Sequence, residues 1–168
     1  LAQEDAGYWG YGSTLNEAMI KTLTYSQPLV ASDGTVLGVL GISLADDYLK
    51  TMLPAKELLS DQSGSYMLAI LDESQAAAEG LTLQKVTHSG GVFIAMFGEA
   101  EELVFQMDQE ISGSGALIHT EALKLKQRIY GSMQPLDLYN TNAPFSHQRW
   151  VLVGLESRDA LYGFSRKI

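Results

Sequence analysis

His119 and Glu121 have the residue types and the spacing of half a metal site. Residues two apart on a strand point to the same side, so the imidazole and the carboxylate could approach one ion. No third donor stands beside them in the sequence. The pattern therefore favours a solvated or hydrogen-bonded pair, and we expect neither a metal nor a cofactor.

The chain carries none of the short motifs that mark common catalytic and nucleotide-binding loops. It lacks a phosphate loop ending in Gly-Lys-Ser/Thr, a Gly-x-Ser-x-Gly, a His-Glu-x-x-His and a calcium-loop spacing. Gly113-Ser114-Gly115 is better explained as a linker, because nothing around it predicts the strand-to-helix elbow of a nucleophile. The acids from Glu99 to Glu102 are better explained as charges at a helix start. We therefore expect a protein that is not an enzyme.

Aromatic and amide side chains near the N-terminus are better candidates, and they suggest binding. Tyr25 and Gln27 are two apart on an extended segment and share a face. Trp9 and Tyr11 stand nearby in a polar, glycine-rich stretch that we expect to be a loop. Together these residues could form an aromatic cage with a polar anchor for a small molecule.

A second group, Tyr130, Ser132 and Gln134, occupies related places later in the chain. A small ligand could contact the same face there, and a cavity behind Tyr130 and Met133 would separate a sensing module from a structural one. The alternative is that Tyr25 and Tyr130 only cover the core, and the residues leave that open.

The elements that must position these side chains begin with the stretch from residue 21 to 53. Residues 21–30 favour an extended backbone, and Asp33-Gly34 supplies the turn of a hairpin. Residues 35–44 are nearly continuous apolar side chains, which predicts a strand covered on both faces. Asp46 and Asp47 then open a short helix.

A weaker copy of this stretch lies near the C-terminus. Gln27-Pro28-Leu29 recurs as Gln134-Pro135-Leu136, and residues 150–157 parallel residues 36–43. Residues 158–168 then form a closing helix. The repeat predicts two related modules, each ending in a long hairpin and a helix.

The remaining segments predict an α+β fold, with a central antiparallel sheet and helices on one face. We expect strands at residues 66–71, 81–88, 116–123, 127–138 and 149–156, and helices at residues 73–80, 99–110 and 158–168, with a helical connector at residues 55–60. The prediction of a helix at residues 99–110 depends on acids in its first turn and on an apolar stripe of Leu103, Val104 and Met107.

Composition limits the partners of the chain. Its net charge of −9 argues against nucleic acid and anionic lipid as partners, and it has no cysteine. No apolar run reaches the roughly 20 residues that a membrane-spanning helix needs. Because the sequence starts at Leu1, we expect a piece of a longer protein.

The order of motifs in the first 53 residues resembles the closing half of a Cache domain, the PAS-like extracytoplasmic sensor module of bacterial receptors. The resemblance rests on Tyr8-Trp9, on Leu23–Leu29 (LTYSQPL), on Asp33-Gly34, on Gly38–Leu44 (GVLGISL) and on the helix that follows. Residues from about 63 onward resemble, more loosely, the membrane-proximal module of a double Cache domain.

This resemblance implies a partial distal module with its connector at residues 1–60 and a complete membrane-proximal PAS-like module at residues 61–168. It implies a ligand around Trp9, Tyr11 and Tyr25, and Ser43 stands where amino-acid-binding members carry an aspartate. The helix from Arg158 would lead into a transmembrane helix.

The expected function is therefore a small-molecule sensor on the outside of the cell membrane, in a histidine kinase, diguanylate cyclase or chemoreceptor. Its partners would be the receptor's transmembrane helices, its cytoplasmic output domain and a second copy in a homodimer. The alternative is a structural, dimerising or protein-interaction module of such a receptor. The candidate ligand-binding residues are Trp9, Tyr11, Tyr25, Gln27, Ser43, Tyr130 and Ser132.

Overall fold

The structure is a computed structural model that describes residues 6–13, 21–58, 64–72, 80–90, 93–111, 115–122, 126–139 and 143–165. The chain divides into two compact units. Unit 1 comprises residues 1–49 and 137–147, and unit 2 comprises residues 50–136 and 148–168. The division thus falls at residue 49, before the expected boundary at residue 60, and a later segment of the chain returns to unit 1.

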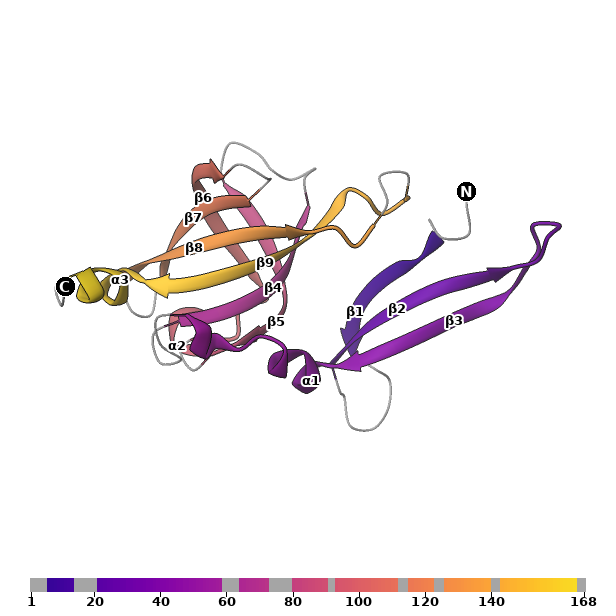
Figure 1. The fold of residues 1–168 in the computed structure, drawn as a ribbon, viewed down its shortest axis with the longest axis horizontal. Helices are drawn as coiled ribbons and strands as arrows, with labels where there is room; N and C mark the ends of the chain where they lie inside the picture. Colours follow the sequence, from indigo (N-terminus) through magenta and orange to yellow (C-terminus); the bar gives the residue numbers. More distant parts are fainter. Residues whose placement is uncertain are drawn as a thin grey trace. The chain divides into compact units, whose positions relative to one another are not determined.

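Unit 1 is built on a three-stranded antiparallel sheet of β1 (Tyr8–Ser13), β2 (Lys21–Val30) and β3 (Val36–Ala45), in that order (Figure 1). The predicted turn joins β2 to β3: Gly34 has φ +88° and its N–H donates to the carbonyl oxygen of Ala31 at 2.9 Å. The Thr35 N–H donates to Asp33 Oδ1 at 2.9 Å, which fixes the carboxylate on the turn. The hairpin is therefore confirmed, whereas the predicted loop around Trp9 is strand β1.

β3 is not covered on both faces, and that prediction is wrong. Its apolar side chains face solvent, with exposed fractions of 72% at Leu37 and 63% at Ile42. Within the described residues β3 pairs with β2 alone, so it is an edge strand. A continuous apolar run shows only that both faces are apolar, and it does not reveal whether anything packs on them.

Unit 2 is a closed antiparallel barrel of six strands (Figure 1). Each strand pairs with the next in the chain, and β9 pairs with both β8 and β4 to close the barrel. The strands are β4 (Gly64–Asp72), β5 (Leu81–Ser89), β6 (Glu102–Ile111), β7 (Gly115–Ala122), β8 (Gln127–Leu136) and β9 (Gln148–Ser157).

The described helices are short. They are α1 (Asp46–Thr51), the 3₁₀ turn η2 (Ala55–Glu57), α2 (Phe93–Phe97) and α3 (Arg158–Ser165). None of the helices within the described ranges has the length and apolar character to span a bilayer. The expectation of antiparallel sheets is confirmed, but the sheet of unit 2 closes on itself where we expected helices to cover one face.

Alternating side chains fill the barrel. Along β9, Val151, Val153 and Leu155 are fully buried, and the residues between them point to the outer face. The interior is completed by apolar residues from the other strands and from α2, including Met67, Leu83, Phe93, Phe105, Ile118 and Ile129.

The helix predicted at residues 99–110 is instead strand β6, so that prediction is wrong. Leu103 and Phe105 are buried while Val104 lies 49% exposed between them, which is the two-residue period of a strand. The acids at the start and three apolar residues at helical spacing outweighed this alternation in the sequence. The helix predicted at residues 73–80 lies outside the described residues, apart from Gly80.

The repeat of Gln-Pro-Leu does mark equivalent positions. Each copy stands at the end of the first strand of a hairpin, β2–β3 or β8–β9, and each hairpin runs into a helix, α1 or α3. The two hairpins lie in different sheets, one in the three-stranded sheet and the other in the barrel.

Candidate functional site

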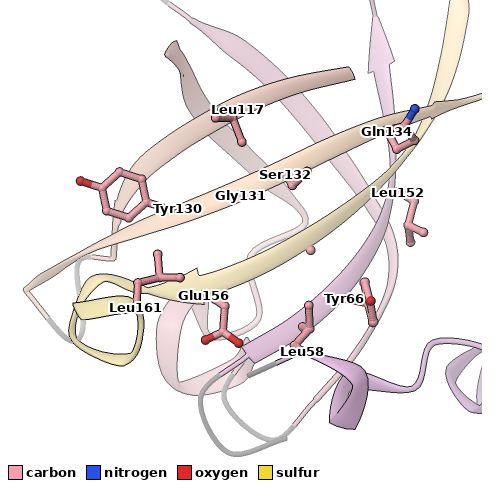
Figure 2. A pocket seen from close by; sticks show the side chains of 11 residues that line it. Leu58, Tyr66, Leu117, Tyr130, Gly131, Ser132, Gln134, Leu152, Glu156 and Leu161 are labelled. Atoms are coloured by element: carbon pink, nitrogen blue, oxygen red, sulfur yellow. The ribbon is translucent and has the colours of Figure 1, made fainter. Parts of the chain in front are cut away.

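A hollow of about 410 Å³ lies on the outer face of the barrel. We call it the barrel groove. Its side chains come from β4, β7, β8 and β9, together with Leu58, which follows η2, and Leu161 of α3 (Figure 2). Its lining residues are Leu58, Tyr66, Leu117, Tyr130, Gly131, Ser132, Gln134, Leu152, Gly154, Glu156 and Leu161.

Small residues in the middle of the sheet create this hollow. One register row crosses β7, β8, β9 and β4 at Leu117, Ser132, Gly154 and Tyr66. Gly154 has no side chain and Ser132 has a short one, so the centre of the row stays low between a leucine and a tyrosine. A methyl group at Gly154 would lie 3.4 Å from both Leu58 Cδ2 and Tyr66 Cε1, so these two side chains overhang the floor.

The next row places a carboxylate at one end of the groove. Glu156 on β9 lies opposite Tyr130 on β8, and it is only 8% exposed. Its Oε1 packs over Gly64 of β4, where any side chain would collide with it and with Leu58. The sheet therefore holds this carboxylate against the barrel wall, beneath Leu58.

The opposite end of the groove is neutral. Gln134 on β8 lies opposite Leu152 on β9. The groove thus presents a carboxylate at one end, an amide at the other, and leucine and tyrosine side chains between. Such a surface binds an amphipathic small molecule through apolar contact and a few placed polar groups.

Leu161 connects the groove to the last described helix. α3 begins directly after β9, at Arg158, and its Leu161 side chain lines the groove near Glu156 (Figure 2). A molecule in the groove would therefore contact α3 itself.

His119 and Glu121, the pair considered for metal binding, each contact a different side chain. His119 Nδ1 lies 2.8 Å from Asp108 Oδ1, and Glu121 Oε1 accepts a hydrogen bond from Arg128 Nε at 3.0 Å. This bond to Glu121 raises the pKa of Arg128. The described part of the chain has no group of three His, Cys, Asp or Glu side chains placed to hold a metal ion.

Four of the predicted residues of unit 1 do share one face of its sheet. Trp9 lies opposite Tyr25, with ring centroids 5.0 Å apart, and Tyr11 lies opposite Leu23 on the same side. Gln27 follows Tyr25 by two residues. The hydroxyl of Tyr11 is buried and accepts or donates no hydrogen bond among the described residues.

Ser43 lies on the other face of that sheet. It stands opposite Thr24 on β2, and the two hydroxyl oxygens are 2.9 Å apart. The structure therefore separates Ser43 from Trp9 and Tyr25. A ligand site on either face of this sheet stays a prediction.

Tyr139 and Phe145, from the segment of residues 137–147 that belongs to unit 1, contact β1. The Trp9 N–H donates to the hydroxyl of Tyr139 at 3.0 Å, and the ring of Tyr8 lies 4.5 Å from that of Phe145. Within this segment the rings of Tyr139 and Phe145 are tilted against each other, with centroids 6.2 Å apart. The strands of the β8–β9 hairpin thus belong to unit 2 while their connection belongs to unit 1.

Tyr130, Ser132 and Gln134, named together from the repeat, all line the barrel groove. Reasoning from the sequence missed the other lining residues, because most of them come from separate strands that only the barrel brings together. One signal was available. Gly154 and Glu156 are two apart, within and just after the apolar run of residues 150–155, so they share a face that a packed core would not need.

No protein-family model matches the chain, and a comparison with curated proteins also finds no match. Among solved structures, the chain is similar to the crystal structure of the periplasmic sensory domain of the Campylobacter jejuni chemoreceptor Tlp1. The TM-score is 0.54 at 10% sequence identity, and the match covers 96% of this chain and 52% of the other. The chain therefore spans about half the length of that structure. At this identity the likeness is one of fold: the chain folds as part of an extracytoplasmic sensory domain does.

Proposed function

We propose that this chain is an extracytoplasmic ligand-sensing domain, of the double Cache type, from a membrane-bound bacterial receptor. A chemoreceptor, a histidine kinase and a diguanylate cyclase are the receptor classes that use such domains. The observation that carries the proposal is the fold shared with a periplasmic sensory domain over 96% of the chain. The barrel groove supplies a site of suitable size, since small-molecule pockets measure about 300–1,000 Å³.

The path of the signal follows from Leu161. A ligand in the barrel groove touches this side chain, so it binds more tightly to the arrangement of α3 in which that contact is best. A ligand shifts an equilibrium only by its differential affinity for two states, and the contact with Leu161 provides such a difference. In a full receptor α3 would pass this shift toward the membrane.

A screen of soluble small molecules by ¹H–¹⁵N NMR tests the proposal. Amino acids, amines, carboxylates, alcohols and sugars would be added to the protein, with the amides of Ser132, Gly154 and Leu161 as reporters. We expect at least one class to shift these three amides together. If no class moves them, the groove is not a ligand site and the sensing proposal loses its support.

The second candidate function is a structural or protein-interaction module of such a receptor. The exposed apolar side chains of β3 favour it, because an edge strand of this kind can pair with another chain. Sedimentation of the protein over a range of concentrations tests this candidate. A monomer at every concentration, with or without a small molecule, would rule out self-pairing through β3, whereas a dimer fits both functions and leaves the decision to the ligand screen.

A further inference from the structure

We propose that the barrel groove selects an amphipathic molecule that carries a protonated amine, with Glu156 as the residue that recognises the ammonium group. This inference rests on the proposed function, because it assigns a ligand class to the same site. It depends on three features of the groove: its charge, its apolar middle and its length.

The groove has one carboxyl group. Glu156 is the sole aspartate or glutamate among the lining residues, and they include no lysine, arginine or histidine. The Glu156 side chain is 8% exposed, so little solvent screens it. In its ionised form it attracts an ammonium group more strongly than a surface carboxylate does, and the ammonium in turn stabilises that form, whereas a carboxylate ligand is repelled.

The middle of the groove selects for an apolar body. Leu58, Leu117 and Leu152 line it, and the rings of Tyr66 and Tyr130 add aromatic surface. The low floor at Ser132 and Gly154 leaves room for a chain or a flat ring to lie across the strands. A ligand that carries charges along its whole length would bind poorly, because the groove would remove water from those charges without offering each one a partner.

The length of the groove follows from the strand. Glu156 and Leu152 lie four residues apart on β9, which corresponds to roughly 13 Å along an extended backbone. Gln134, opposite Leu152, offers a neutral donor and acceptor at that end. The geometry therefore fits an elongated amine whose far end is apolar or carries one uncharged polar group.

Three probes with the same hexyl chain test the assignment: hexylamine, hexan-1-ol and hexanoate. Each would be titrated into the protein of 168 residues at neutral pH, and the shifts of the Ser132 and Gly154 amides would be followed by NMR. We expect hexylamine to bind at least about tenfold more tightly than hexanol, the gain of a hydrogen bond to a charged group. Hexanoate should bind most weakly of the three.

The Glu156→Gln variant removes the charge and keeps the size of the side chain. We expect it to bind hexylamine about tenfold less tightly and to leave hexanol unchanged. Glu110→Gln is the matched control, since it makes the same change at an exposed position of β6 outside the groove, and it should bind all three probes as the natural protein does.

The outcomes separate the two proposals. Equal binding of hexylamine and hexanoate by the natural protein, or unchanged hexylamine binding by Glu156→Gln, would overturn the amine assignment while leaving a ligand site in place. Absence of any shift with all three probes, and with every class of the wider screen, would remove the sensing function itself. The ranking of probes uses the natural protein alone, so it decides the matter even if the variant does not fold.

Discussion

Gly131 and Gly154 lie on neighbouring barrel strands but face opposite sides of the wall. A methyl group at Gly131 would point inward, 3.0 Å from Ile118 Cγ1 and 3.2 Å from Leu155 Cδ2. A methyl group at Gly154 would point into the barrel groove and meet its neighbours at ordinary contact distance. The same substitution should therefore have different effects at the two positions.

We predict that Gly131→Ala lowers the free energy of unfolding by about 1–3 kcal/mol, because it overpacks a filled core. Gly154→Ala should change it by less than about 1 kcal/mol, since an alanine restricts the unfolded chain and fits the groove. Urea unfolding followed by circular dichroism measures both. A larger loss at Gly154 than at Gly131 would show that the inner and outer faces are assigned the wrong way round.

The carboxyl group of Asp33 should make the stability of the β2–β3 turn depend on pH. The hydrogen bond from the Thr35 N–H holds the pKa of this carboxyl below its ordinary value of 3.8. A lowered pKa in the folded state means that the ionised carboxylate stabilises the turn at pH values above about 3.8, and that this contribution is lost as the pH falls through the folded pKa.

The Thr35 amide shift should therefore titrate at a pH below 3.8 in the natural protein. In Asp33→Asn the same amide should show no such titration, while the side-chain oxygen still accepts its hydrogen bond. NMR spectra recorded from pH 6 to pH 2 measure this. A midpoint at or above the ordinary value would contradict the assigned hydrogen bond.

At this scale the sequence revealed part of the site. Tyr130, Ser132 and Gln134 could be identified because residues two apart on a strand share a face. The spacing of Glu156 from Gly154 also puts these two on one face, but it does not assign Glu156 to a site, because a glutamate at the end of an apolar run is equally well explained as a solvated strand end. Only its register against Tyr130 and Gly64 brings it to the wall of the groove.

Among the elements, β3 departs most from what its sequence suggests. It is exposed, carries no charged side chain and lies at the edge of its sheet. Such an edge offers backbone N–H and C=O groups with which a strand of another molecule can pair. We predict that Leu37→Lys, at a position that is 72% exposed, reduces self-association of the protein at high concentration. Its melting temperature should stay within about 2 °C, because a surface change of this kind costs less than about 0.5 kcal/mol.

Analytical ultracentrifugation measures this effect. Gln109→Lys adds the same charge at an exposed position of β6 and serves as the control, with no expected effect on association. If both variants reduce association equally, net charge and not the β3 edge is responsible.

The misassigned helix at residues 99–110 illustrates how local signals compete. Acids in a first turn are a helix signal of less than about 1 kcal/mol, whereas burial of one large apolar side chain is worth roughly 1.5–3 kcal/mol. The barrel buries Leu103 and Phe105 on one face of β6. Tertiary packing therefore decided the conformation, and the sequence alone contains no measure of that packing.

At the scale of the molecule, the segment of residues 137–147 matters most, because it joins unit 1 although it connects two strands of unit 2. We predict that Phe145→Ala destabilises unit 1 by about 1–3 kcal/mol through the loss of its ring contacts with Tyr8 and Tyr139. The indole N–H signals of Trp9 and Trp150 report on the two units separately. In urea, the signal of Trp9 should move to a lower midpoint than that of Trp150.

Phe97→Ala is the matched control for this experiment. Phe97 packs against Phe93 and Phe105 in unit 2, with ring centroids 5.1 Å and 6.3 Å away. Its loss should lower the Trp150 midpoint more than the Trp9 midpoint. Equal shifts of both signals in both variants would mean that the two units unfold as one.

The organisation into two hairpin-and-helix modules could be read from the repeated Gln-Pro-Leu segments, since each repeat is local in sequence. Closure of the barrel could not. It depends on the pairing of β4 with β9, which stand far apart in the chain, and no periodicity within either strand specifies that partner.

The pairing of β9 with both β4 and β8 has a consequence for biosynthesis. The chain emerges from the machinery that makes and exports it with its N-terminus first, so β9 is the last barrel strand to appear. Until then β4 and β8 each present a row of unpaired amide and carbonyl groups. The partly folded chain therefore stays open to pairing with other chains until β9 has emerged.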